Sequence, residues 1–320
     1  MESLVSIIIV NWNAKDYIKQ CIDSLLLQSY KNFEIIIVDN ASTDNSVAII
    51  KQNYPQVTLI ENKDNLGFSA GNNIGIKESK GTLIALFNPD AVAEKDWLQR
   101  LVSIVENSEN IGGASGKIFY LGDKYGKDAV FCTWSKINPY SAIPTNFYDN
   151  EPISTVDYLS GAAVLFKKSV FDKIGLLDTK YFLYFEETDL CARMIRAGYN
   201  LMYVPTAIAW HAVSPLSNSE NKIYYMERNR FRFALKNFDL KYIPIFIVYY
   251  LSESFIIFLR DIKNRNLTRS KIRSRALNWN LINFVHIWKD RAQDFSLIKK
   301  HGVFKSYNNS LPLHGIKNKQ

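Results

Sequence analysis

The sequence predicts an α/β fold with a mostly parallel central sheet flanked by helices, followed by a basic helical C-terminal region. Three observations lead to this prediction. Short β-branched runs alternate with amphipathic stretches through the first 90 residues. These runs are continuously apolar, which is typical of strands covered on both faces. The last hundred residues instead combine long apolar or amphipathic stretches with many Lys and Arg residues.

The expected N-terminal elements alternate between strand and helix. Strands are predicted at residues 5–10, 33–38, 57–61 and 82–87, and helices at residues 16–28 and 43–53. In the first helix an apolar face repeats with the helical period and can therefore lie on the sheet. That face is formed by Ile18, Ile22, Leu25 and Leu26. Ser42 is placed to cap the second helix.

The following part of the chain is less regular. Residues 123–156 contain three prolines and no clear periodicity, which indicates a long loop or flap near the site. Strands are expected at residues 160–166 and 201–204. Between them, a helix is expected to begin near Thr188 and to end at Gly198.

Composition excludes several classes of protein. The chain has 320 residues, of which 47% are hydrophobic, so it is not a disordered protein. Cys21, Cys132 and Cys191 have no CxxC spacing, which argues against a disulfide framework and a thiolate zinc site. The first apolar run has no basic flank and no small-residue cleavage site, so it is interpreted as a strand and not as a signal peptide. We therefore expect a cytoplasmic protein.

The charge is divided unevenly along the chain. Residues 1–220 carry 19 Lys and Arg residues against 25 Asp and Glu residues, whereas residues 221–320 carry 20 against 6. An acidic body with a basic tail suits an anionic partner, either nucleic acid or the negatively charged face of a membrane. A merely soluble basic helix pair would have the same charge.

Polar residues follow three of the predicted strands. These tips are Asn11-Trp12-Asn13, Asp39-Asn40 and Asn88-Pro89-Asp90. In open α/β sheets, ligands bind beyond the carboxyl ends of the strands. Each tip alone could be ordinary turn chemistry, but the three together favour one ligand-binding crevice.

A Gly/Asn-rich segment, residues 65–75, leads into a helix. Glycine lets a ligand approach the backbone, and a helix N-terminus can bind phosphate or ribose oxygens. The segment matches neither GxGxxG nor GxxxxGK[ST], which disfavours a Rossmann dehydrogenase and a P-loop NTPase.

Two further groups of side chains are candidates for chemistry. Glu186 and Glu187, with Asp189 close behind, stand at a predicted helix start, where acids are also favoured by the helix dipole alone. His211 is the only histidine in the first 220 residues, and beside Trp210 it could simply be packed.

Six stretches together resemble glycosyltransferase family 2, the inverting GT-A enzymes, and particularly its rhamnosyltransferase-like members of cell-envelope polysaccharide synthesis. The stretches are VSIIIVNWN, IIIVDNASTDNS, NLGFSAGNNIGI, FNPDA, SGAAVLFKKSVFDKIGLLD and FLYFEETDLCARMIRAGYNLMYVPTAIAWH. They occur in the family's order, which makes coincidence improbable. The resemblance covers residues 5–237 and implies a GT-A nucleotide-diphospho-sugar transferase fold.

The resemblance also implies where the donor binds. Asn11, Trp12 and Asp39 would surround the nucleobase, with Asp39 hydrogen-bonding a pyrimidine edge. Near the ribose and diphosphate would lie Asn65, Gly67 and Asn72. Asn88 stands where the family has the first acid of its DxD triplet, and an amide there brings no negative charge.

For the reaction itself, the resemblance implies a divalent metal, Mg²⁺ or Mn²⁺, bound by Asp90 and His211. Such an ion prefers oxygen ligands, and Mn²⁺ also tolerates one imidazole. Glu187 matches the family's catalytic base, although the family more often has Glu-Asp at this pair. Glu186 and Asp189 are the next candidates for the base.

The C-terminal part, residues 238–320, is predicted to associate with a membrane, whereas residues 1–237 form the catalytic domain. Residues 243–259 are apolar except at three positions. This run is shorter than the stretch of about 20 apolar residues that a membrane-spanning helix needs. A basic cluster follows directly, formed by Arg260, Lys263, Arg265, Arg269, Lys271, Arg273 and Arg275. This pattern suggests insertion into one leaflet. A second helix, residues 276–295, has an apolar face that could pack on the body, meet the bilayer or form a homodimer.

The sequence thus predicts a metal-dependent inverting glycosyltransferase at the inner face of the cell membrane. Its donor would be a UDP- or dTDP-sugar, with rhamnose a candidate, and its acceptor a glycan or lipid-linked saccharide. A nucleotidyltransferase is disfavoured because its Gly-rich, basic first loop is missing after Val10. A non-catalytic, membrane-associated scaffold that binds sugar nucleotides is the other alternative. It is supported only by Asn88 and Glu187, which depart from the residues usual in the family. Nucleic acid is not expected as a partner, because the apolar run beside the basic tail favours lipid.

Overall fold

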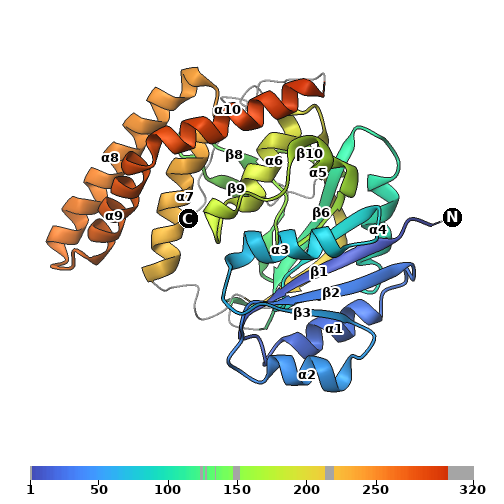
Figure 1. Cartoon of the computed structure of the whole chain (residues 1–320). Helices are drawn as coiled ribbons and strands as arrows, with labels where there is room; N and C mark the ends of the chain where they lie inside the picture. Colours follow the sequence, from blue (N-terminus) through green and yellow to red (C-terminus); the bar gives the residue numbers. More distant parts are fainter. Residues whose placement is uncertain are drawn as a thin grey trace.

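Figure 1 shows the fold of the chain in a computed structural model. It describes residues 2–122, 125–126, 128–133, 135–146, 152–212 and 220–301. Parts of the predicted flap at residues 123–156 therefore lie outside the described residues. Where that segment is described, it contains short strands and not only loop. These are β7 (Val130–Cys132), β8 (Ser135–Ile137), β9 (Pro144–Asn146) and β10 (Ser154–Val156).

The centre of the molecule is a ten-stranded mixed sheet whose main strands follow the order β10-β12-β6-β11-β4-β1-β2-β3. The main strands besides β10 are β1 (Val5–Asn11), β2 (Phe33–Asp39), β3 (Thr58–Glu61), β4 (Leu83–Phe87), β6 (Ile111–Tyr120), β11 (Ala163–Lys167) and β12 (Asn200–His211). Strands β1 to β4 are parallel, as predicted, whereas β11 runs antiparallel to both β4 and β6. The other half of the sheet is therefore mixed and not parallel.

Helices cover both faces of this sheet, as predicted (Figure 1). On one face lie α1 (Ile18–Leu26), α2 (Ser46–Asn53) and α4 (Trp97–Val105). On the other lie α3 (Gly67–Glu78), α5 (Lys168–Ile174) and α6 (Glu186–Arg196). Side chains of β1 point alternately to the two faces of the sheet, since Ile7 and Ile9 pack with α1 and Ile8 packs with α3.

Two glycines of the Gly/Asn-rich segment are explained by this packing. A Cβ on Gly71 would come within 2.8 Å of the Val10 side chain, and one on Gly75 within 2.5 Å of Ile8. Real Cβ contacts are longer, so α3 can lie this close to β1 only because both residues lack a side chain. The close approach brings the N-terminus of α3 beside the tips of β1 and β2.

Three predicted features differ in detail. Strand β12 runs from Asn200 to His211, far longer than the predicted residues 201–204, and His211 is its last residue. Helix α6 begins at Glu186, two residues before Thr188. Ser42 does not cap α2, which begins at Ser46; its hydroxyl donates to Asp39 instead. Ser42 lies three residues before Asn45, the N-cap residue of α2, and is therefore too early in the chain to cap the helix.

Residues 220–301 form a helical layer beside the sheet. It comprises α7 (Glu220–Asn237), α8 (Ile243–Lys263), α9 (Thr268–Ile282) and α10 (Phe284–Lys300). The single helix predicted at residues 276–295 is therefore wrong, because the chain turns at Asn283 between α9 and α10. Helix α10 runs back across α7 to α5 and α6, where Ile298 joins their apolar core (Figure 1).

Candidate functional site

The predicted strand tips meet at one edge of the sheet. Asn11 at the end of β1 lies directly beside Asp39 at the end of β2. On the other side of β1, Ile8 pairs with Leu86 of β4, so the turn after β4 projects at the same edge. Parallel strands present their carboxyl ends together, so the three tips project from one edge of the sheet, as the sequence predicted.

Asn11 and Asp39 form a buried hydrogen-bonded pair. The Asn11 Nδ2 donates to Asp39 Oδ1 at 2.7 Å and to Ser46 Oγ at 2.9 Å. Ser42 adds a hydroxyl bond to Asp39 Oδ1 at 2.6 Å and a backbone N–H bond to Oδ2 at 3.0 Å. Oδ2 of the Asp39 carboxylate retains capacity for a further donor. Trp12, the next residue after Asn11, is 45% exposed, and its indole is available to a ligand at this edge.

The N-terminus of α3 is held by side chains from neighbouring loops. Asn65 Oδ1 accepts from the Gly67 N–H at 2.9 Å, and the Phe68 N–H donates to the Phe182 carbonyl at 2.7 Å. Two of the helix's first N–H groups are thus already bonded within the protein. Asn40, the second residue of the predicted Asp39-Asn40 tip, donates to the Gly67 carbonyl at 3.0 Å.

Asn72 lies one turn into α3 and is buried. Its Nδ2 donates to the Phe68 carbonyl at 2.9 Å, while its Oδ1 has no hydrogen-bond partner among the described residues. An unpaired buried oxygen costs about 1–3 kcal/mol, so a ligand donor there would be favourable. Asn65 and Gly67 shape the helix start, and Asn72 offers the open acceptor.

The turn after β4 brings Asn88, Asp90 and His211 together. Strand β5 (Ala91–Ala93) follows the turn and pairs antiparallel with the end of β12, which places Ala91 opposite His211. As a result, His211 Nε2 lies 3.1 Å from Asp90 Oδ1 and 3.1 Å from Asn88 Nδ2. Both the Asp90 and the His211 side chains are mostly buried but reachable, at 15% and 12% exposed.

The Asp90–His211 pair fits a metal that shares its ligands with a substrate. The described residues contain no group of three or more His, Cys, Asp or Glu side chains that could hold an ion by themselves. Neighbouring ligands of an octahedral ion with bonds of about 2.1 Å lie about 3 Å apart, close to the Asp90–His211 separation. Asn88 Oδ1 is buried and unpartnered among the described residues. Ions bound by one or two protein ligands are commonly completed by substrate phosphates.

Glu186 and Glu187 begin α6 with their carboxyl groups close enough to share a hydrogen bond. Burial raises the pKa of Glu187, and burial together with the neighbouring charge of Glu187 raises the pKa of Glu186 further. Tyr158 donates its hydroxyl to Glu187 Oε1 at 2.9 Å, whereas no described N–H or hydroxyl donates to Oε2. Gly161 packs against Glu187, since a Cβ there would lie 3.4 Å from Glu187 Cγ. Gly161, which has no side chain, therefore faces the Glu187 carboxylate.

Asp189, in contrast, points away from Glu187 into a buried ionic cluster. Its carboxylate bonds to Arg193 at 2.8 Å, Lys236 at 3.0 Å, Asn237 at 2.8 Å and Tyr181 at 3.1 Å. Burial opposes its ionisation, but Lys236 and Arg193 outweigh burial and lower the pKa of Asp189. These contacts join α6 to α7 and leave Asp189 without access to a substrate.

The loop before α6 is strained and is held by α7. Phe182, Tyr184 and Phe185 all have positive φ angles, of 65°, 68° and 72°. Such a conformation costs of order 1 kcal/mol or more for each residue and persists only when its surroundings fix it. Asn229 of α7 is fully buried and donates to the carbonyls of residues 181, 183 and 184 at 2.9, 2.8 and 2.7 Å. Sequence reasoning missed Asn229, because an Asn within a helix gives no sign of a distant loop.

The chain is similar to one protein family model and to several known glycosyltransferases. The model of Glycosyl transferase family 2 matches residues 6–175. Glycosyltransferase GlyA of Streptococcus pneumoniae is 26% identical over 62% of the chain, a match that spans only 31% of GlyA. The low-salt glycan biosynthesis hexosyltransferase Agl10 of Haloferax volcanii is 28% identical over 71% of the chain and 74% of its own length. An N-acetylglucosaminyl-diphospho-decaprenol L-rhamnosyltransferase of Mycobacterium tuberculosis is 25% identical over 66% of the chain and 76% of its own length.

Two solved structures share the fold. GalNAc-T7, determined with UDP, GalNAc and Mn²⁺, superposes with a TM-score of 0.61 at 15% identity, over 75% of the chain and 49% of GalNAc-T7. The mannosyltransferase PcManGT of Pyrobaculum calidifontis, determined with GDP-Man and Mn²⁺, superposes with a TM-score of 0.57 at 16% identity. That match covers 94% of the chain and 87% of PcManGT.

Proposed function

Since the chain belongs to glycosyl transferase family 2 and has the GT-A fold, we propose that it is a metal-dependent inverting glycosyltransferase that uses a nucleotide-diphosphate sugar. A UDP- or dTDP-sugar is the proposed donor, with rhamnose a candidate sugar, and a glycan or lipid-linked saccharide in cell-envelope polysaccharide synthesis is the proposed acceptor. The name of the mycobacterial rhamnosyltransferase supports rhamnose and a lipid-linked acceptor, and the GalNAc-T7 structure with UDP and Mn²⁺ supports a uridine nucleotide and a metal. The PcManGT structure supports the metal alone, because its nucleotide sugar is GDP-Man. Residues 1–237 would form the catalytic domain.

One observation carries the proposal: the candidate metal turn and the candidate base lie on the two sides of one short segment. The Asn88 N–H donates to the Ala162 carbonyl at 2.9 Å, and the adjacent Gly161 packs against Glu187. Burial and the charges of Glu186, Glu187 and Asp90 raise the pKa of Tyr184, which lies two residues before Glu186, to about 12. A reacting sugar between Asp90 and Glu187 would thus face a metal on one side and a base on the other.

The chain's own side chains would divide the work as follows. Asn11, Trp12 and Asp39 would hold the nucleobase, and Asn65, Gly67 and Asn72 would position the ribose and diphosphate. Asp90 and His211 would hold Mg²⁺ or Mn²⁺, which when bound stabilises negative charge on the leaving diphosphate. Asn88 would orient a sugar hydroxyl or the metal's ligands. Glu187 Oε2 would take the proton from the acceptor hydroxyl as it attacks, and a single displacement of this kind inverts the anomeric carbon.

A thermal-shift screen with nucleotide sugars tests the proposal directly. We expect UDP- or dTDP-sugars with Mn²⁺ or Mg²⁺ to raise Tm, because a ligand that binds only the folded protein stabilises it by about 2.7 kcal/mol at a hundred times its Kd. Metal-free samples with EDTA serve as the control and should show a smaller shift. The absence of any metal-dependent shift with UDP-, dTDP- or GDP-sugars would contradict the proposal.

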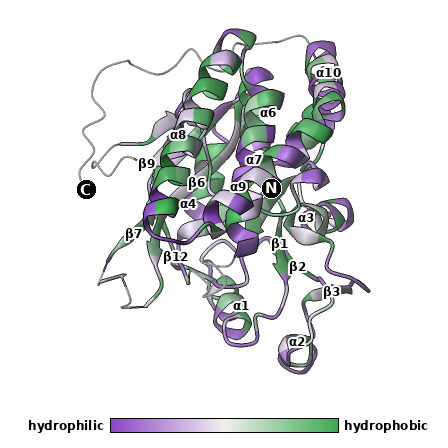
Figure 2. Cartoon of the chain, turned by 90° about the vertical axis from the view of Figure 1, so that its left-hand side faces the viewer, coloured by the Kyte–Doolittle hydropathy of each residue, from purple (hydrophilic) through white to green (hydrophobic). Residues whose placement is uncertain are grey.

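We also propose that residues 238–320 attach the enzyme to the inner face of the membrane. The described residues contain one helix, Leu240–Lys263, that is long and apolar enough to cross a membrane, although most of it is not covered by protein. Figure 2 shows the apolar residues along α8. Those exposed on α8 and at the α9–α10 turn include Val248, Leu251, Phe255, Ile256, Leu259, Leu281, Ile282 and Val285. A patch of this kind beside exposed Arg and Lys residues fits an anionic lipid surface.

Two charged residues of this region turn inward instead. Glu253, the acid in the middle of the apolar run, accepts from Arg230 at 2.7 Å and from Arg273 at 3.1 Å. Arg273 also bonds to Glu227 at 2.8 Å, so it is the one member of the predicted basic cluster that is buried in ion pairs. The acid therefore does not oppose lipid contact on the exposed side of α8.

We expect the full chain to co-sediment with phosphatidylglycerol vesicles and Phe255→Glu to reduce its partition coefficient about tenfold or more. Removing a buried phenyl ring from lipid forfeits about 1.5–3 kcal/mol of apolar burial, and the new charge adds repulsion. Leu27→Glu is the matched control, because Leu27 is 68% exposed at the end of α1, outside the patch. Equal loss in both variants, or a wild-type chain that stays in the supernatant at low salt, would refute membrane attachment.

A further inference from the structure

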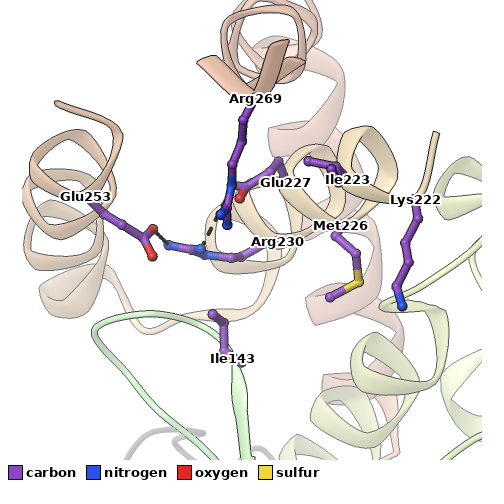
Figure 3. Close-up of a pocket in the computed structure, with 8 residues that line it drawn as sticks. All are labelled: Ile143, Lys222, Ile223, Met226, Glu227, Arg230, Glu253 and Arg269. Carbon is purple, nitrogen blue, oxygen red and sulfur yellow. Dashed lines mark hydrogen bonds and ion pairs between the residues drawn. The ribbon is translucent and has the colours of Figure 1, made fainter. Parts of the chain in front are cut away.

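A cavity of about 550 Å³ lies between the catalytic domain and α8 (Figure 3). Helix α7 forms its floor with Ile223, Met226 and neighbouring charged residues. Glu253 of α8 and Arg269 in the first turn of α9 close two of its sides. Ile143, from the segment between β8 and β9, closes another side. The lining thus combines three apolar side chains with five charged ones.

Positive charges outnumber negative ones around this cavity. Lys222, Arg230 and Arg269 line it together with two carboxylates, Glu227 and Glu253. Both carboxylates are already bonded to arginines, with Arg230 2.7 Å from Glu253 and Arg273, just behind the lining, 2.8 Å from Glu227. Arg269 makes no ion pair with any carboxylate in the described parts of the chain and extends toward the cavity (Figure 3). The surplus charge favours an anionic ligand.

One end of the cavity leads to the candidate active site. The Lys222 ammonium lies 5.8 Å from the centre of the Tyr184 ring. Tyr184 lies two residues before Glu186, the first residue of α6, and burial together with the charges of Glu186, Glu187 and Asp90 raises the pKa of its phenol. Burial lowers the pKa of Lys222, so a nearby anion would stabilise its charged form. One aromatic side chain therefore separates this cation from the carboxylates.

The other end leads to the exposed apolar side of α8. Glu253 lines the cavity, and Tyr249 and Ile256, one turn before and one turn after it on the same side of α8, are 43% and 57% exposed. A ligand with an anionic group in the cavity could therefore continue along an apolar surface on one side and reach the active site on the other. Only an amphiphile with a charged group between its chain and its reacting sugar matches both ends.

From this arrangement we propose that the cavity binds the phosphate or diphosphate of a lipid-linked acceptor, with Lys222 and Arg269 contacting the anion. The lipid chain lies along α8, and the saccharide beyond the phosphate reaches past Tyr184 toward Glu187. The inference rests on the proposed glycosyltransferase function and names its acceptor class. It makes Lys222 and Arg269 specificity-determining residues for that acceptor.

Binding of farnesyl diphosphate, measured by calorimetry with the full-length chain in nonionic detergent, tests the proposal. EDTA is present, so that the diphosphate cannot bind through a metal at Asp90. We expect Lys222→Gln and Arg269→Gln each to raise Kd about tenfold, because each removes one charge-assisted hydrogen bond to the anion. Lys271→Gln is the matched control, since Lys271 is exposed on the same helix as Arg269 and does not line the cavity.

Three outcomes would overturn the proposal. Farnesyl diphosphate could fail to bind, or it could bind the two cavity variants as tightly as the wild type. Its affinity could also fall as much in Lys271→Gln as in the cavity variants, which would indicate general attraction to a basic surface. Displacement by dihexanoyl phosphatidylglycerol at equal concentration would instead identify a phospholipid headgroup site. The thermal shift with donor sugar should be unchanged in both cavity variants. If that shift is present but farnesyl diphosphate does not bind as expected, the acceptor site is wrong and the glycosyltransferase function still stands.

Discussion

Asp90→Ala is expected to reduce metal-dependent sugar transfer by about 10³-fold or more while leaving the protein folded. The carboxylate stands on a turn at the sheet edge, 3.1 Å from His211 Nε2, and the described residues offer it no other ion-pair partner. Its loss would remove the only negatively charged ligand of the proposed ion. An ion that stabilises the leaving diphosphate contributes several kcal/mol in the transition state, and each 1.36 kcal/mol is a factor of ten in rate.

The measurement is turnover of the donor identified by the thermal-shift screen, with Mn²⁺ titrated from zero to saturation. Asp16→Ala is the control, because Asp16 is an exposed acid of the same domain. His211→Ala should raise the Mn²⁺ concentration needed for half-maximal rate and reduce the maximal rate less, since a neutral ligand is lost. Full activity of Asp90→Ala in the presence of EDTA would show that Asp90 does not act through a metal.

The strand tips show how far the sequence can predict a site. Apolar runs followed by Asn and Asp placed the ends of β1, β2 and β4 at one sheet edge, and the register of Asn11 with Asp39 confirms that arrangement. The sequence could not show that Asp39 would already be bonded to Asn11 and Ser42, because that depends on how the next loop folds back. Strand pairing follows from pattern, whereas side-chain partners follow from loop geometry.

The acids of α6 were open to a sharper prediction than the sequence analysis made. Successive helix residues are rotated by about 100°, so Glu187 and Asp189 point about 160° apart and cannot both face one substrate. The structure has Glu187 beside Gly161 and Asp189 in the ionic cluster with Arg193 and Lys236. Asp189 is therefore better explained as a structural residue than as a catalytic candidate.

Long-range contacts account for most of what the sequence could not predict. Asn229 fixes the loop before α6 from about 45 residues further along the chain, and no local pattern marks it. The turn at Asn283 was missed because the apolar positions of α9 and α10 mimic one continuous helix. The cavity beside α8 depends on how four separated segments come together, which a single sequence does not encode in any short motif.

Glu187→Gln is expected to reduce transfer to the acceptor by about 10²-fold or more, the usual contribution of a general base. Glutamine keeps the size of the side chain and can still accept from the Tyr158 hydroxyl, which bonds to Oε1 at 2.9 Å. It has no basic oxygen at the Oε2 position, which receives no N–H or hydroxyl donor from the described residues. Donor binding measured by calorimetry with Mn²⁺ should change little, because Glu187 would face the acceptor.

The pH dependence of transfer distinguishes a base from a structural acid. Burial raises the pKa of Glu187, and burial with the charge of Glu187 raises that of Glu186, so the two titrate as a coupled pair. Only the ionised base is active; the rate should therefore fall as pH drops through the raised apparent pKa, at a higher pH than the ordinary value of about 4.3. In Glu187→Gln this fall in rate at acidic pH, the acidic limb of the profile, should disappear, and the low remaining rate should not depend on pH in that range. Glu186→Gln keeps a hydrogen-bond donor beside Glu187, as a protonated Glu186 does, and should therefore retain transfer and the acidic limb. Near-normal transfer by Glu187→Gln, together with a lowered Tm, would instead mean that Glu187 only stabilises the start of α6 and that the base lies elsewhere.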